Sequence, residues 1–232
     1  MAIKDDLTAE VSQTFAEHWE VQKALVIPDP AGLRLDNHAK DLEHATVLYA
    51  DLDGSTKMVD NYLWSFSAEI YKTYLRCAAR VIAVEDGTVT AYDGDRVMAI
   101  FTGEKKNTRA VRAAMKINEA VKTIINPQLK RVYTKTDFTV KHVIGIDTSR
   151  LRTARIGVRG YNDLVWIGRA ANYAAKLTSL SERTIWITQA IYDNMDSVVK
   201  IHNATKKNMW VPRSWTAMNN MQIYCTDFSF VL

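Results

Sequence analysis

The sequence predicts an α/β domain, of the kind also described as α+β, built on a mixed sheet. Short apolar segments typical of buried strands alternate with longer segments whose apolar residues recur at helical spacing. Asp93-Gly94 between two alternating segments predicts a hairpin, which makes the sheet mixed rather than purely parallel. A chain of 232 residues that is 47% apolar and 24% charged has the composition of a globular protein with a substantial core.

The first 43 residues are predicted to form a helical leader and linker ahead of a single domain over 44–232. Leu7, Val11, Phe15 and Trp19 recur at helical spacing, which predicts a helix over 5–27 that Pro28 ends. Residues 33–43 are largely polar and are interpreted as a connection. The leader could pack on its own domain or on a partner subunit, and both alternatives stay open.

Chemistry is expected where the first strand of the domain ends. Val47–Leu52 is apolar except for Asp51, and the turn over 53–56 leads into a helix that Ser55 or Thr56 can cap. A strand that enters a helix in this way places carboxylates beside free backbone N–H groups, which suits a metal ion that carries a phosphate chain. The alternative is that Asp51 and Asp53 are ordinary turn-forming acids.

A second acid belongs to the predicted hairpin over 88–101. Asp95 lies at its tip, where it is either a solvated turn residue or a partner for Asp51. Together they would supply the two carboxylates that a two-cation phosphoryl-transfer site requires.

The remaining elements follow from spacing and turn signals. Two consecutive helices are predicted over 55–84, then a helix over 107–125 closed by Pro127 and a strand over 138–146. Further elements are expected in this order: a strand at 164–166, an Ala-rich helix at 167–177, a strand at 183–187, a helix at 189–195, a strand at 198–202, a polar insertion at 203–216 and a strand at 221–230.

Two polar pairs are candidates for contact with an anionic ligand. Strand alternation puts Arg150 and Arg152 on one face, and the planar fork of arginine suits phosphate oxygens, although both could be surface residues. Asn172 and Lys176 lie one helical turn apart on the same face. Asparagine is a poor helix former, so its position favours a polar role over a plain surface position.

Composition excludes several classes. The longest apolar runs fall well short of the roughly 18 residues of a membrane span, and the first residues lack the apolar core of a secretory signal. Cys77 and Cys225 are the only cysteines and have no metal-type spacing. Cys77 falls within a helical pattern and is interpreted as buried and reduced, which favours a cytoplasmic setting. A net charge of +4 is too small to indicate a nucleic-acid surface, but it suits a site for a polyanion.

Three motifs in order resemble the class III nucleotidyl cyclases over about residues 44–190. They are Asp51-Leu52-x-Gly54, Gly94-Asp95 in the hairpin, and the series Trp166-x-Gly168-x-x-x-Asn172-x-x-x-Lys176. The resemblance implies that 44–232 is a cyclase catalytic domain with a ferredoxin-like βαββαβ core and added strands. It also implies a head-to-tail homodimer with both active sites at the interface.

The same resemblance implies a role for each motif residue. Asp51, Asp95 and the Leu52 carbonyl correspond to the ligands of two Mg²⁺ or Mn²⁺ ions, and the turn Gly54, Ser55 and Thr56 is expected to meet the substrate. Asn172 corresponds to the asparagine that orients the ribose from the opposite subunit. Lys176 stands where the family usually has an arginine that stabilises charge on the α-phosphate, and Arg150 resembles a phosphate-contacting arginine. The family's C-terminal phosphate-binding lysine has no clear match; Lys206, Lys207 or Arg213 could substitute.

The chain differs from the purine cyclases at positions that are expected to contact the nucleotide base. Ala91 and Val165 stand where those enzymes carry polar residues that select adenine or guanine, and a site without such groups loses its means of selection. Tyr49 replaces a common phenylalanine beside the predicted base pocket, unless it is a core tyrosine. These features resemble the pyrimidine cyclases of bacterial anti-phage signalling, in particular the uridylate branch. The resemblance implies UTP as substrate, cyclic UMP as product and a separate effector that senses the product. A cytidylate or adenylate cyclase, an inactive nucleotide sensor and a structural α/β dimer stay open.

Overall fold

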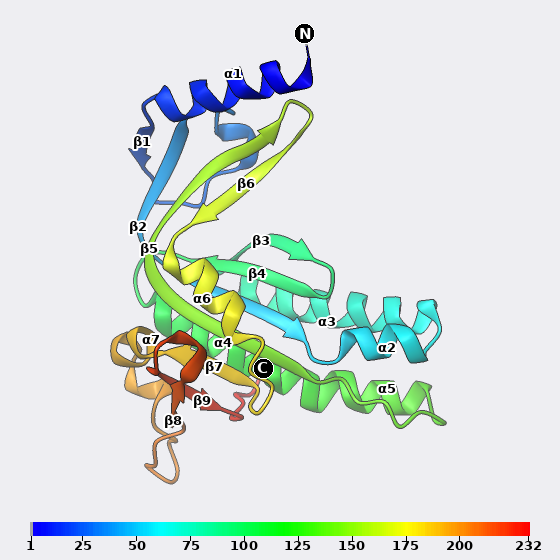
Figure 1. Cartoon of the computed structure of the whole chain (residues 1–232). Helices are drawn as coiled ribbons and strands as arrows, with labels where there is room; N and C mark the ends of the chain where they lie inside the picture. The colour runs from blue at the N-terminus through cyan, green and yellow to red at the C-terminus, as the bar shows by residue number, and fades with distance from the viewer. Residues whose placement is uncertain (1) are drawn as a thin grey trace.

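The computed structural model describes residues 2–232 (Figure 1). The helices are α1 (Ile3–Ala16), α2 (Ser55–Asn61), α3 (Trp64–Val84), α4 (Lys106–Ala120), α5 (Asn126–Val132), α6 (Arg169–Leu177) and α7 (Gln189–Asn194). The strands are β1 (Glu20–Lys23), β2 (His38–Leu52), β3 (Thr88–Asp93), β4 (Arg96–Phe101), β5 (His142–Val158), β6 (Tyr161–Ile167), β7 (Ile185–Thr188), β8 (Val211–Trp215) and β9 (Met221–Thr226). None of the described helices combines the length and the apolar character that crossing a membrane requires.

The strands form one mixed sheet in the order β3-β4-β2-β5-β7-β9-β8, with β1 beside β2 and β6 beside β5. Strand β2 runs antiparallel to β4 and β5, whereas β5 runs parallel to β7. The predicted mixed sheet, the hairpin over 88–101 and the two consecutive helices over 55–84 are confirmed.

The alternation of side chains along β2 divides the core into two layers. Leu48, Ala50 and Leu52 point to the side covered by α3 and α4. Val47 and Tyr49 point to the other side, which α6 covers (Figure 1), and there they share a core cluster with the alanines of that helix. Because successive strand residues face opposite sides, Asp51 lies on the side of α6.

Helix α6 approaches β5 closely because Gly145 has no side chain. A Cβ at this position would lie 2.1 Å from the Ala174 carbonyl oxygen and 2.8 Å from the Leu177 Cβ. We expect Gly145→Ala to lower the free energy of unfolding by about 2–3 kcal/mol, since backbone atoms of a packed helix would have to move. Urea unfolding measures the loss. Gly32→Ala, where a Cβ would meet no atom within 4 Å, is the control and should be near neutral.

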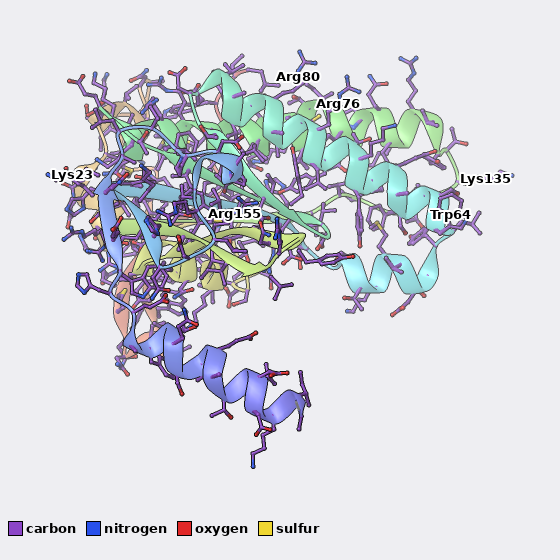
Figure 2. The ribbon with its side chains drawn as sticks, turned by 90° about the horizontal axis from the view of Figure 1, so that it is seen from above. Lys23, Trp64, Arg76, Arg80, Lys135 and Arg155 are labelled. Atoms are coloured by element: carbon purple, nitrogen blue, oxygen red, sulfur yellow. The ribbon has the colours of Figure 1, made fainter. Side chains whose placement is uncertain are left out.

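The predicted helix over 5–27 is wrong beyond Ala16. Residues 20–23 instead form β1, whose backbone pairs in parallel with the beginning of β2. None of the residues of α1 is buried, and Figure 2 shows this helix extending away from the sheet. Helical spacing of apolar residues therefore did not indicate burial here.

Residues 38–43 are part of β2 rather than a connection. Their polar character reflects a buried ion pair, because Asp41 is 2% exposed and accepts from arginines of β5. The boundary predicted between residues 43 and 44 falls within β2, beside a bulge where Glu43 has φ 56°. The division into leader and catalytic domain stays a prediction.

Three further expectations need correction. Pro127 does not end a helix, because a π-helical turn over Val121–Ile125 leads directly into α5. Pro127 lies in the first turn of α5, where its missing N–H is tolerated. Residues 198–202 form a 3₁₀ turn and one isolated bridge instead of a strand, and β5 begins only at His142. The predicted insertion over 203–216 contains β8, which pairs with β9 and buries Trp215.

Candidate active site

Asp51 and Asp95 lie at adjoining strand ends. Asp51 is the penultimate residue of β2 and stands opposite Arg96, the first residue of β4. Asp95 directly precedes Arg96 in the turn from β3 to β4. The structure therefore brings together the two acids that the sequence analysis paired.

The electrostatics of Asp51 reflect this arrangement. Burial, and after it the negative charge of Asp95, raise the pKa of Asp51 from 3.8 to about 6, while Arg96 opposes the rise. Thr178, just after α6, lies within reach, with its Oγ1 3.4 Å from the Asp51 Oδ2. Two carboxylates that repel each other at a strand end favour a cation between them.

The donor set fits Mg²⁺ or Mn²⁺. No group of three or more His, Cys, Asp or Glu side chains that could hold a metal occurs in residues 2–232. A dedicated protein cage is thus missing from the described chain. Mg²⁺ does not require one, because it commonly binds through one or two carboxylates and takes substrate phosphates and water as its other ligands. Asp51, Asp95 and the carbonyl of Leu52 are the groups that would hold it.

The turn after β2 differs from the prediction in its cap. Gly54 is the N-cap of α2 and has φ 78°, a left-handed conformation that glycine adopts without strain. Neither Ser55 nor Thr56 caps the helix, since both lie inside its first turn and no side-chain cap hydrogen bond forms. Their hydroxyls are therefore not used as caps, and a contact with substrate stays a prediction.

Asn172 and Lys176 are exposed on the outer face of α6. The inner face buries Ala170, Ala174 and Leu177 against the sheet. The beginning of the helix is fixed because the Arg169 Nε donates to the completely buried Asp147 carboxylate, at 3.1 Å. Within one chain the two side chains therefore face away from the sheet that carries Asp51.

Arg150 is remote from the aspartates of its own chain. It stands opposite His44, whereas Asp51 stands opposite Val143, seven residues earlier in β5. Its guanidinium donates to the Asp41 carboxylate through Nε at 2.8 Å and Nη2 at 2.5 Å. The guanidinium is thus paired with Asp41 in this chain, and a phosphate contact of Arg150 stays a prediction.

Two of the three base-pocket candidates lie together. Tyr49 stands opposite Met98 and Ala91 also stands opposite Met98, so the three residues cross the sheet side by side. The Tyr49 hydroxyl is 3.1 Å from the Met98 sulfur, a weak acceptor that leaves the hydroxyl able to bind another group. Val165 is 42% exposed on β6, opposite Ala154 of β5, and does not join them within one chain.

Two further residues near the aspartates, Arg96 and Thr178, are not indicated by any sequence motif. Arg96 pairs with Asp93 at 2.5 Å and lies over the ring of Tyr49, with its Cζ 5.7 Å from the ring centroid. The hairpin register gives only its pairing with Asp93, and its place opposite Asp51 depends on the long-range pairing of β4 with β2. Thr178 gave no signal either, because its contact with Asp51 depends on where α6 ends.

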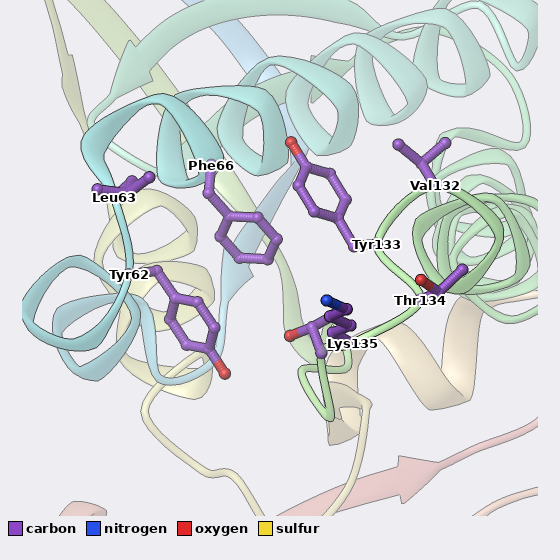
Figure 3. A pocket seen from close by; sticks show the side chains of 8 residues that line it. Tyr62, Leu63, Phe66, Val132, Tyr133, Thr134 and Lys135 are labelled. Atoms are coloured by element: carbon purple, nitrogen blue, oxygen red, sulfur yellow. The ribbon is translucent and has the colours of Figure 1, made fainter.

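An apolar pocket of about 450 Å³ lies elsewhere, between the α2–α3 junction and the segment after α5 (Figure 3). Tyr62, Phe66 and Tyr133 contribute aromatic walls. None of the residues predicted for the site lines it, and it contains no acid. It is therefore not the candidate active site.

The fold is that of the class III nucleotidyl cyclases. No protein-family model matches the chain. Among solved structures, the adenylyl cyclase CyaB from P. aeruginosa superposes with a TM-score of 0.66 at 22% identity, covering 81% of this chain and 94% of that one. This similarity confirms the predicted fold.

Curated relatives identify the family within this class. A protein named uridylate cyclase from Burkholderia cepacia is 57% identical over 219 residues, 94% of either chain. Another of that name from Xanthomonas perforans is 54% identical over 229 residues, 98% of either chain. The chain belongs to the uridylate cyclase family, and it is a nucleotidyl cyclase.

Proposed function

We propose that the protein converts UTP to 3′,5′-cyclic UMP and pyrophosphate. The observation that carries the proposal is the pair Asp51 and Asp95 at adjoining strand ends, beside a sheet surface formed by Tyr49, Met98 and Ala91. The names of the curated relatives support the same substrate.

The reaction is an in-line attack of the ribose 3′-hydroxyl on the α-phosphorus, with pyrophosphate as leaving group. Two divalent cations, when bound, supply positive charge that favours the 3′-alkoxide and neutralises the phosphates. Asp51 and Asp95 hold that charge at the strand ends. The side chains then have little covalent work to do, so positioning and charge stabilisation carry the catalysis.

Asn172 and Lys176 complete the site from a second copy of the chain. Both point away from the sheet of their own chain, which supports a head-to-tail dimer in which each chain lends them to the other. Asn172 would orient the ribose, and Lys176 would place a point charge near the α-phosphate, where an arginine would offer a fork. Arg150 and Val165 lie far from the aspartates of their own chain, so any contact they make with substrate would also cross the dimer.

The surface around Tyr49 favours a pyrimidine. Ala91 offers no side-chain hydrogen bond, so a purine edge would lose polar contacts that it makes with water. The Tyr49 hydroxyl is half-buried and paired only with a sulfur atom, which leaves it able to bind the base.

The four-nucleotide assay tests the substrate. Purified protein with Mn²⁺ is incubated separately with UTP, CTP, ATP and GTP, and cyclic product and pyrophosphate are quantified. We expect cyclic UMP to form fastest. Cyclic CMP or cyclic AMP as main product would overturn the choice of UTP, and nucleotide binding without pyrophosphate release would indicate a sensor.

Tyr49→Phe is expected to lower the UTP-to-ATP rate ratio about fivefold to tenfold. That range corresponds to the loss of one hydrogen bond to the base, about 1–1.4 kcal/mol. Competition assays with both nucleotides measure the ratio. Tyr92→Phe removes an exposed hydroxyl from β3 and is the control, with an unchanged ratio expected. An unchanged ratio in Tyr49→Phe would remove Tyr49 from the base pocket.

The wider role proposed is cytoplasmic second-messenger synthesis in anti-phage defence, with the product read by a separate effector. Both cysteines are free, which supports a reducing compartment. Measuring cyclic UMP in cells before and after phage infection tests the role, and an unchanged level would contradict it.

A further inference from the structure

Two buried polar groups lie behind the strand ends that carry Asp51 and Asp95. Tyr74 of α3 is completely buried, and His142, the first residue of β5, is 6% exposed. Their ring centroids are 5.7 Å apart, with an interplanar angle of 41°. Across residues 2–232, neither the Tyr74 hydroxyl nor the His142 Nε2 finds a hydrogen-bond partner.

His142 belongs to the rung of the sheet that carries a predicted metal ligand. It stands directly opposite Leu52 in the β2–β5 ladder. The next pairing continues past the strand end, because the Asp53 N–H donates to the Lys141 carbonyl at 3.0 Å. The backbone that presents the Leu52 carbonyl is therefore held by the segment that carries His142.

Tyr74 connects this rung to the hairpin. Its ring packs in the same cluster as Leu52 of β2 and Val97 of β4. Burial, and after it the negative charges of Asp51 and Asp95, raise the pKa of Tyr74. Tyr74 thus belongs to the core layer that also buries Leu52 and Val97, on the side of the sheet opposite α6.

The two groups are chemically complementary. A phenol has one hydrogen to donate, and a neutral imidazole has one nitrogen that accepts. Leaving both buried and unpaired would cost roughly 1–3 kcal/mol for each. The structure forms no direct hydrogen bond between them, and one water shared by both groups would remove this cost.

We propose that a single buried water bridges the Tyr74 hydroxyl and the His142 Nε2, which make no direct hydrogen bond to each other, and that this link positions the metal-binding strand ends. The link ties α3 to the Leu52 rung and so fixes Asp51 relative to Asp95. Tyr74 and His142 are positioning residues, since neither reaches the substrate side of the sheet. The inference rests on the proposed function in one respect: the groups being positioned are metal ligands.

A double-mutant cycle in urea unfolding tests the link without any activity. The variants are Tyr74→Phe, His142→Leu and both together. We expect each single variant to lower the unfolding midpoint, because one polar group is left alone, and the double variant to lose less than the sum of the two. A Tyr74→Phe variant as stable as the wild type or more stable, or additive losses, would overturn the water bridge.

Mn²⁺ binding tests the positioning role. In Tyr74→Phe, the Mn²⁺ concentration for half-maximal cyclisation should rise about tenfold, as is typical when a group that supports a metal ligand is lost. The KM for nucleotide at saturating Mn²⁺ should not change. Electron paramagnetic resonance of free Mn²⁺ measures binding directly, in the absence of turnover. His142→Gln keeps an acceptor and should restore much of the affinity lost in His142→Leu.

Tyr192→Phe is the matched control. Its hydroxyl accepts from Asn208 at the far end of the fold, so Mn²⁺ binding should not change. If the double-mutant cycle shows coupling between Tyr74 and His142 but Mn²⁺ binding is unchanged in Tyr74→Phe, the positioning role is wrong. Failure of the wild type to cyclise any nucleotide would instead refute the proposed function, while the unfolding cycle would still decide the water bridge.

Discussion

Asp51→Asn is expected to abolish cyclisation and, at the same time, to stabilise the metal-free protein. The activity should fall about 10³-fold or more, the scale of removing a group that stabilises charge in a transition state. An amide keeps the shape of the carboxylate but removes its charge, so the fold should persist. Cyclic product and pyrophosphate measure the loss.

The stabilisation follows from the pKa of Asp51, which rises from 3.8 to about 6 on folding. Because the folded protein binds this proton more tightly, the carboxyl contributes most favourably below pH 3.8, and that contribution is lost as the pH rises through 6. If the whole pKa shift is converted into free energy of unfolding, it amounts to about 3 kcal/mol. Because the carboxyl is only half-buried and solvent screens it, we expect a stability difference of about 1–2 kcal/mol.

Thermal unfolding in EDTA between pH 4.5 and 8 measures this effect. The wild type should lose stability relative to Asp51→Asn as the pH rises, and excess Mn²⁺ should reverse the order at pH 8. Asp53→Asn is the control, because Asp53 is exposed and should change neither quantity. An Asp51→Asn variant that keeps a tenth of the activity, or unfolds more easily than the wild type in EDTA at pH 8, would contradict the metal assignment.

Mixing two inactive variants, Asp51→Asn and Asn172→Ala, is expected to restore activity. In a two-fold dimer with shared sites, a mixed dimer has one site with both defects and one with none. Random exchange of subunits between equal amounts of the two variants makes half of the dimers mixed. Each mixed dimer has one intact site out of two, so about one quarter of all sites become active. Cyclisation rates before and after mixing measure the recovery.

The control mixes Asp51→Asn with Asp95→Asn, both defective in the metal-binding half. No site in that mixture is intact, because each metal-binding half carries one defect. Recovery in the control, or none in the first mixture after subunit exchange is verified, would contradict a site built from two chains. Asn172→Ala retaining wild-type activity would remove Asn172 from the site.

Local patterns predicted much of the core because they depend on neighbours in the sequence. Asp93-Gly94 fixed the hairpin, since that pair favours the turn whatever surrounds it, and alternation along β2 separated its two faces. The same reasoning failed at residues 20–27 and 198–202. There the outcome depended on whether a distant strand was available to accept backbone hydrogen bonds.

The sequence by itself determined the alternating α/β order, the hairpin and the two acids that a metal site needs. Only the tertiary structure decided that Asp51 stands opposite Arg96, that Asn172 faces outward and that Arg150 pairs with Asp41. It also placed Tyr74 and His142 together behind the site. The reason is physical: turn and strand preferences act over a few residues, whereas register, burial and charge pairing join residues far apart in the chain.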